Sequence, residues 1–305
     1  MSAASSGHQL GQLVGDWFEE NVAVFLLNEV AMRLNLYLDH RFKERECRGA
    51  KILWSDLDGN EVDYDFVLEL RGTDKLKGIP LAFFETFWRR GSRHSKDKAR
   101  DDSGKLMPMR ITYPTARVLG IISAGDFTRP AQELVNSRGI DLFYIPKNEI
   151  VEAWRQAGVE MDYSDSADEN EKAALVAKTS SLLNKDKFKE IFDNLYSGNR
   201  EAIFKSYIQR IIANISALPI QFEVCTVYVS EPLIFSSHED VQKYLNGETD
   251  KHSITEMHKT VSFKVIFSDG NIFERSELSA REALELNEAV NSVSQHFTSL
   301  SDKDN

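Results

Sequence analysis

Apolar residues in the first part of the chain recur with the periods of helices and strands. Between residues 15 and 38 they return every three or four positions, which predicts a long amphipathic helix. Two alternating runs within residues 50–70 flank Asp58-Gly59-Asn60, a sequence typical of a hairpin turn. We expect a third strand over residues 79–88, which is apolar nearly throughout and therefore buried.

Helices and strands alternate in the next stretch. A polar, basic helix is expected over residues 93–107, breaking before Pro108. Shorter elements follow, namely strands over 116–125 and 140–146 and helices over 129–139 and 147–158. Such alternation indicates parallel pairing. Together with the preceding meander, it predicts an α/β fold with a mixed sheet, an antiparallel meander plus parallel strands, flanked by helices.

A second unit is expected after an acidic segment. Residues 161–172 contain few apolar side chains and predict a linker between a first domain over 1–160 and a second over 173–305. The second part predicts a smaller α+β domain, with helices over 186–218 interrupted at 197–199, a strand over 220–229, a hairpin turning at Asp269-Gly270 and a closing helix over 281–297. Because this part has its own apolar strands and no basic run, we expect it to dimerise or to bind a partner.

Charge and cysteine content narrow the classes of protein. The net charge is −11, which opposes nucleic-acid binding, but residues 89–117 hold nine lysines and arginines against three aspartates. The only cysteines, Cys47 and Cys225, exclude a disulfide framework and favour a reduced, cytoplasmic setting. No apolar run is long and uncharged enough to suggest a membrane span.

Three carboxylates are candidates for chemistry. Asp63 and Asp65 open an expected strand two residues apart, and Glu85 lies inside the apolar strand LAFFETFW. Adjacent antiparallel strands can set Asp65 beside Glu85. Carboxylates that converge in this way repel one another unless a cation lies between them, and oxygen ligands suit magnesium or manganese.

This pattern resembles the PD-(D/E)XK, restriction-endonuclease-like, superfamily of nucleases over about residues 10–158. An acidic residue opens one strand, and a second acidic residue follows about twenty residues later in an apolar strand. The helix start GDWFEENV also resembles that of several such nucleases, in which a glutamate corresponding to Glu19 reaches the metal site. The resemblance implies a metal-dependent endonuclease that hydrolyses DNA, of a restriction or phage-defence type.

The sequence departs from the motif at two positions. Tyr64 stands where the motif has proline, and Phe87 stands where it has lysine. The resemblance implies that a neighbouring helix can supply the lysine instead. We therefore expect Lys98 to take that role, with Arg89 and His94 as rivals.

The implied mechanism assigns a role to each group. Asp65 and Glu85 would bind Mg²⁺, with Mn²⁺ as an alternative, and Lys98 would stabilise the charge that develops on the phosphate. Glu19 and Asp63 would support the metal site. The nucleic-acid backbone would be bound by basic residues after Glu85, namely Arg90, Arg93, Lys96, Arg100 and Lys105.

Other interpretations remain open. Asp63, Asp65 and Glu19 can be ordinary solvated acids, and Glu85 can be paired with Arg89 or Arg90. The basic stretch can be a solvated face. A chain without the motif's lysine can be an inactive nuclease fold that binds nucleic acid or a protein, and the same chemistry can cut RNA.

Overall fold

A mixed sheet forms the centre of the computed structural model, which describes residues 5–226, 231–248 and 260–302. In this part of the chain its five strands lie in the order β1 (Tyr37–His40), β4 (Phe66–Leu70), β5 (Ile79–Arg89), β6 (Val118–Gly125) and β7 (Asp141–Pro146). β1, β4 and β5 pair antiparallel, whereas β5, β6 and β7 pair parallel. The expectation of a mixed α/β sheet with an antiparallel meander and parallel strands is therefore confirmed.

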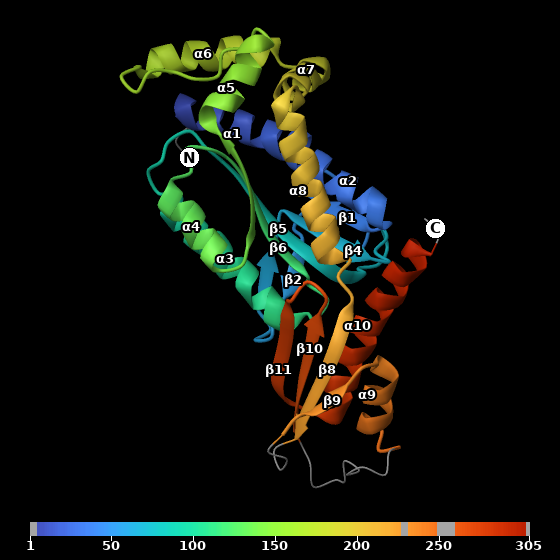
Figure 1. Cartoon of the computed structure of the whole chain (residues 1–305). Coiled ribbons are helices and arrows are strands. Elements are labelled where there is room, and N and C mark those ends of the chain that lie inside the picture. The colour runs from blue at the N-terminus through green and yellow to red at the C-terminus, as the bar shows by residue number, and fades with distance from the viewer. Residues whose placement is uncertain (1–4, 227–230, 249–259, 303–305) are drawn as a thin grey trace.

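Helices cover both faces of this sheet (Figure 1). One face carries α3 (Ser95–Thr112) and α4 (Arg129–Ser137), which pack on Phe83, Phe87 and Ile121. The other face packs against a larger group: α1 (Ser6–Trp17), the π-helical segment η1 (Phe18–Ala23), α2 (Val24–Leu34), α5 (Lys147–Gln156), α7 (Lys185–Tyr196) and α8 (Asn199–Ile215). The sheet is thus buried on both sides, as its apolar strands require.

A second sheet follows α8 along the chain. Its strands lie in the order β11 (Ile272–Leu278), β10 (Val261–Phe267), β8 (Pro219–Thr226) and β9 (Leu233–Phe235). α9 (His238–Leu245) and α10 (Ala280–Ser301) contribute to its core with Tyr244 and Val290. The predicted hairpin at Asp269-Gly270 is confirmed by the pairing of β10 with β11. The expected strand over 220–229 ends at Thr226 in the structure, and residues 227–229 lie outside the described residues.

The first helical stretch begins and ends earlier than the sequence predicts, since α1, η1 and α2 follow one another without a gap from Ser6 to Leu34. It ends at Leu34 because Asn35 adopts a left-handed conformation, with φ 50°, which closes the helix. The residues after it form β1, the edge strand of the main sheet. The expected bounds of 15 and 38 are therefore both wrong, although a long helix is present.

Two further expectations are corrected. The hairpin around Asp58-Gly59-Asn60 exists, but its strands β2 (Leu53–Ser55) and β3 (Glu61–Asp63) form a separate two-stranded sheet, so β1 takes the place expected for the hairpin in the meander. Helix α3 continues through Pro108. Proline deprives the carbonyl four residues earlier of a donor, and that residue is the exposed Gly104, where water can replace the lost bond.

The segment expected to link two domains is partly helical. α6 (Glu169–Leu182) begins inside it, with Asp168 as its N-cap. The core on the α1 face also includes Ile191, Phe204, Ile211 and Phe297. Residues of the predicted second domain thus contribute to two cores, and the division into two domains stays a prediction.

Candidate active site

The two carboxylates at the centre of the sequence prediction come from neighbouring strands. Asp65 immediately precedes β4, and Glu85 lies within β5. These strands are antiparallel with Phe66 opposite Phe84, so one further step in the same register sets Asp65 opposite Glu85. The strand order of the main sheet therefore brings the two acids together.

Asp65 is held against β5 by two hydrogen bonds. Its Oδ2 atom accepts from the backbone amide of Thr86 at 2.7 Å and from the Thr86 hydroxyl at 3.1 Å. Thr86 directly follows Glu85. The bonds therefore fix the Asp65 carboxylate beside the strand position that carries the second acid.

Glu85 is a buried carboxylate with one partner. Only 1% of the residue is exposed, and Lys105 of α3 donates from Nζ to Oε2 at 2.8 Å. The other oxygen, Oε1, is buried and lacks a hydrogen-bond partner among the described residues. Burial, and then the charges of Asp65 and Asp102, raise the pKa of Glu85 to about 8.

Lys98, the expected substitute for the motif's lysine, lies next to that position. Its ammonium is 5.6 Å from the centre of the Phe87 ring and donates to Asp102 Oδ1 at 2.6 Å. Asp102 is completely buried, and its Oδ2 atom has no partner in the described part of the chain. Burial raises the pKa of Asp102, an effect that Lys98 opposes. α3 thus brings two lysines and a further carboxylate to the site.

Glu19 approaches from the opposite face of the sheet. It lies in the π-helical segment η1, and Arg41 donates to both of its carboxylate oxygens at 2.7 Å. Arg41 also donates to Asp16 at 2.6 Å. Burial, and then the charge of Asp65, raise the pKa of Glu19 to about 7. The charges of Glu19 and Asp65 therefore interact, while both carboxylate oxygens of Glu19 are bound by Arg41.

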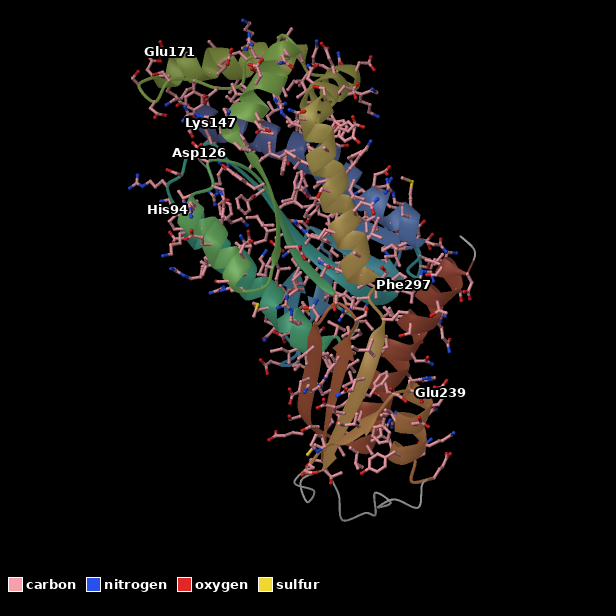
Figure 2. The ribbon with its side chains drawn as sticks, viewed as in Figure 1. His94, Asp126, Lys147, Glu171, Glu239 and Phe297 are labelled. Carbon is pink, nitrogen blue, oxygen red and sulfur yellow. The ribbon has the colours of Figure 1, made fainter. Side chains whose placement is uncertain are left out.

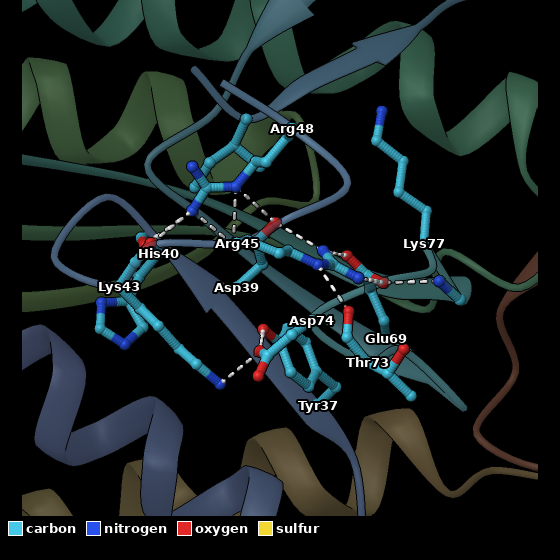
Figure 3. Close-up of polar contacts among 12 residues, drawn as sticks. Tyr37, Asp39, His40, Lys43, Arg45, Arg48, Glu69, Thr73, Asp74 and Lys77 are labelled. Atoms are coloured by element: carbon cyan, nitrogen blue, oxygen red, sulfur yellow. Dashed lines mark hydrogen bonds and ion pairs between the residues drawn. The ribbon is translucent and has the colours of Figure 1, made fainter. Parts of the chain in front are cut away.

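A buried ion cluster holds the loop that carries Arg41 (Figure 3). Arg45 donates to Asp39 at 2.6 Å and to both carboxylate oxygens of Glu69 at 2.6 and 2.8 Å. Arg48 donates to Asp39 at 2.7 Å. Asp39 lies on β1 and Glu69 on β4, so the cluster ties the loop after β1 to the main sheet.

Three predicted site residues lie elsewhere. Asp63 ends β3, where its Oδ1 atom accepts from the amide of Ile52 at 2.9 Å, so it closes the hairpin. His94 precedes α3 at the margin of the molecule, largely exposed and 3.2 Å from Asp97 (Figure 2). Arg89 ends β5, and its carbonyl accepts from the amide of Asp126.

The predicted nucleic-acid-binding residues fall into three groups. Arg90 stacks 3.8 Å above the Tyr163 ring and pairs with Asp162 and Asp165, both at 2.9 Å, so it anchors the acidic segment. Lys105 is bound to Glu85. The others, namely Arg93, Lys96 and Arg100, are exposed on α3 or just before it.

Asp102 and Arg41 were not predicted from the sequence as members of the site, and Lys105 was predicted to bind the nucleic-acid backbone instead. A signal for Asp102 was present, because its spacing from Ala99 and Leu106 puts it on the buried side of α3. The sequence contains no comparable signal for Arg41, because this residue follows strand β1, which was not predicted.

The donor atoms at the site are suited to a hard divalent cation. The oxygens Glu85 Oε1 and Asp102 Oδ2 are buried without partners in the described chain, a costly state that a cation would relieve. Across residues 5–226, 231–248 and 260–302, however, no three His, Cys, Asp or Glu side chains are arranged to hold a metal ion. The chemistry of the donors fits, while their present arrangement is not a complete ligand set.

Comparisons with known proteins give no relative. The chain matches no protein-family model, no curated protein and no solved structure. Among the described residues, no helix has the length and apolar character needed to span a membrane. Functional inference therefore depends on the geometry of the site.

Proposed function

We propose that this chain is a metal-dependent endonuclease of the PD-(D/E)XK class that hydrolyses DNA phosphodiester bonds. The observation that carries the proposal is the meeting of Asp65 and Glu85, from antiparallel strands, with two lysines of the adjacent helix. Strongly perturbed buried carboxyls are typical of functional sites, which supports this choice over a structural role.

Each residue of the site has a distinct role in this proposal. Asp65 and Glu85 would hold Mg²⁺ or Mn²⁺, which when bound activates a water and polarises the scissile phosphate. Thr86 keeps the Asp65 carboxylate in position. Lys98, above Phe87, and Lys105, beside Glu85, are the two groups able to stabilise charge on the phosphate.

The exposed basic residues of α3 provide the surface for the phosphate backbone. Lys96 and Arg100 are exposed on the helix that also carries Lys98 and Lys105. Backbone contacts of this kind position a duplex without reading its sequence. A role in restriction or phage defence is consistent with such an enzyme.

A second candidate is a nuclease fold that binds nucleic acid without cutting it. Phe87 in place of the motif's lysine favours it, as do the ion pairs that hold Lys98 and Lys105 on carboxylates. Under this alternative the acids and lysines of the site neutralise one another and serve only to stabilise the fold.

A cleavage assay separates the two candidates. Supercoiled plasmid DNA and a structured RNA are each incubated with the full-length chain and Mg²⁺. The wild type should nick DNA, and Glu85→Ala should reduce the rate by about 10³-fold or more. Asp101→Asn, which changes an exposed acid on the same helix, is the matched control. Binding without cutting supports the second candidate, and cutting of RNA alone changes the substrate class.

We also propose that residues 173–305 mediate dimerisation, since two sites are needed to cut both strands of a duplex. Light scattering of the full-length chain tests this, with and without a short DNA duplex. A monomer under both conditions contradicts it.

A further inference from the structure

The carboxylates around Asp65 are each matched by a basic side chain of the protein itself. Glu19 is bound by Arg41, Glu85 by Lys105, and Asp102 by Lys98. Asp65 instead accepts hydrogen bonds from Thr86. The site thus contains its own counter-ions, which differ in how firmly they are held.

Lys105 has the features of a releasable group. Its side chain is 42% exposed, whereas that of Glu85, its partner, is 1% exposed. The Lys105 carbonyl accepts from the Tyr64 hydroxyl at 2.7 Å, which anchors the backbone at this point. The backbone is therefore fixed while the long, flexible side chain reaches from solvent to the buried acid.

Lys98 is held more firmly. Its side chain is 24% exposed, and its partner Asp102 lies one turn further along the same helix and is completely buried. Its ammonium also lies over the Phe87 ring. Moving Lys98 would leave a buried carboxylate without its only described donor, so this ion pair belongs to the rigid part of the site.

We propose that Lys105 is an internal counter-ion, which occupies the place of the divalent cation at Glu85 in the unloaded protein and moves to the substrate phosphate when the cation binds. This inference rests on the proposed function, because it concerns the same site. In the present arrangement, Glu85 Oε2 is occupied by the Lys105 ammonium.

Electrostatics make the two cations competitors. An ammonium at 2.8 Å from Glu85 Oε2 repels a divalent cation placed on the same carboxylate. A bound cation must therefore displace the ammonium, and the free energy needed for this displacement weakens the affinity for the cation. Once displaced, Lys105 remains next to the site, where a charge-assisted bond to a phosphate oxygen is available.

Calorimetric titration of the full-length chain with Mn²⁺, in the absence of nucleic acid, tests the competition. Lys105→Met should bind Mn²⁺ about tenfold more tightly than the wild type, since a nearby like charge is removed. Lys178→Met, a change of an exposed lysine on α6, should leave the affinity unchanged. Equal or weaker binding by Lys105→Met overturns the inference.

A second measurement needs no variant at Lys105. The wild type is acetylated briefly with and without Mg²⁺, and modification of individual lysines is quantified by mass spectrometry. Release predicts faster modification of Lys105 with Mg²⁺, relative to Lys178. Unchanged or slower modification contradicts release.

The two proposals fail in different ways. If neither the wild type nor Lys105→Met binds Mn²⁺, the metal-dependent function is wrong and the counter-ion role fails with it. If the wild type binds Mn²⁺ and cuts DNA while Lys105→Met gains no affinity, only the counter-ion role is wrong.

Discussion

Two clusters of buried charges lie at opposite ends of β4, and they differ in how completely their atoms are paired. In the cluster around Arg45, both oxygens of Asp39 and both oxygens of Glu69 accept hydrogen bonds. In the candidate site, Glu85 and Asp102 each keep one buried oxygen without a partner in the described chain.

This difference is what we expect between a structural network and a site that binds a cation. A fully paired network gains stability and specificity only when each member is satisfied, as it is around Arg45. An unpartnered buried carboxylate oxygen costs stability, and a catalytic role or a bound ion is one explanation for it. The raised pKa of Glu85 agrees with this, because it indicates that the ionised carboxylate is destabilised by burial and lacks sufficient partners.

The largest loss of stability is expected in the cluster around Arg45, in which every carboxylate oxygen has a partner. Arg45→Met should destabilise the protein by roughly 3–5 kcal/mol, because Asp39 and Glu69 lose a buried partner. Lys105→Met should cost much less, because Lys105 is 42% exposed and is bound to one acid, whereas Arg45 is fully buried between two. Urea denaturation of both variants measures the difference. Equal losses would mean that the two clusters are alike.

The next effect is the change of stability with pH at the candidate site around Glu85. The pKa of Glu85 is raised from 4.5 to about 8. Its contribution to the free energy of unfolding is therefore fully present below pH 4.5 and is lost as pH rises through about 8. Glu85→Gln lacks this loss. Between pH 5 and pH 8.5 the wild type should lose on the order of 3–4 kcal/mol more than the variant, measured by urea denaturation. Glu61→Gln, at an exposed position, should follow the wild type.

Magnesium should stabilise the protein by binding at the candidate site around Glu85 and not at the cluster around Arg45. At ten times its dissociation constant, Mg²⁺ should raise the free energy of unfolding of the wild type by about 1.4 kcal/mol. A thermal melt with and without Mg²⁺ measures this as an increase in Tm. The increase should vanish in Glu85→Gln, and its persistence there would place the cation elsewhere.

The smallest effect concerns the basic residues outside the clusters. Replacing Lys96 and Arg100 by glutamine should reduce the salt dependence of duplex DNA binding by about two in logarithmic slope. Arg90→Gln should leave the slope unchanged, since Arg90 is bound to Asp162 and Asp165. Fluorescence anisotropy at several salt concentrations, without Mg²⁺, measures both. A reduced slope for Arg90→Gln would show that this arginine leaves its acids for DNA.

The sequence predicted the central strands and their acids because their signals are local. A carboxylate inside LAFFETFW is conspicuous, and turn residues fixed the hairpin around Gly59. It did not predict β1, because Leu36 and Leu38 continue the helical spacing while Asn35 alone ends the helix. Arg41 was missed for the same reason, since it follows β1.

From the sequence, Lys98 was predicted to replace the motif's lysine and Lys105 to bind the nucleic-acid backbone. Lys98 and Lys105 are seven residues apart and therefore lie on the same side of the helix. Which of them reaches Glu85 depends on the position of α3 along β5, a tertiary property without a local signal. The structure sets Lys105 on Glu85 and Lys98 on Asp102.

The core on the α1 face of the main sheet has a consequence for synthesis of the chain. It includes Phe204 and Ile211 of α8 and Phe297 of α10, so it is incomplete until nearly the last helix has been made. The strands and helices up to Gln156 thus emerge from the ribosome with an uncovered apolar surface. At roughly 5–20 residues per second, the remaining residues take on the order of ten seconds to follow. We therefore expect a nascent chain to need protection of this surface during synthesis, and a product truncated within residues 161–172 to be less soluble than the complete sequence.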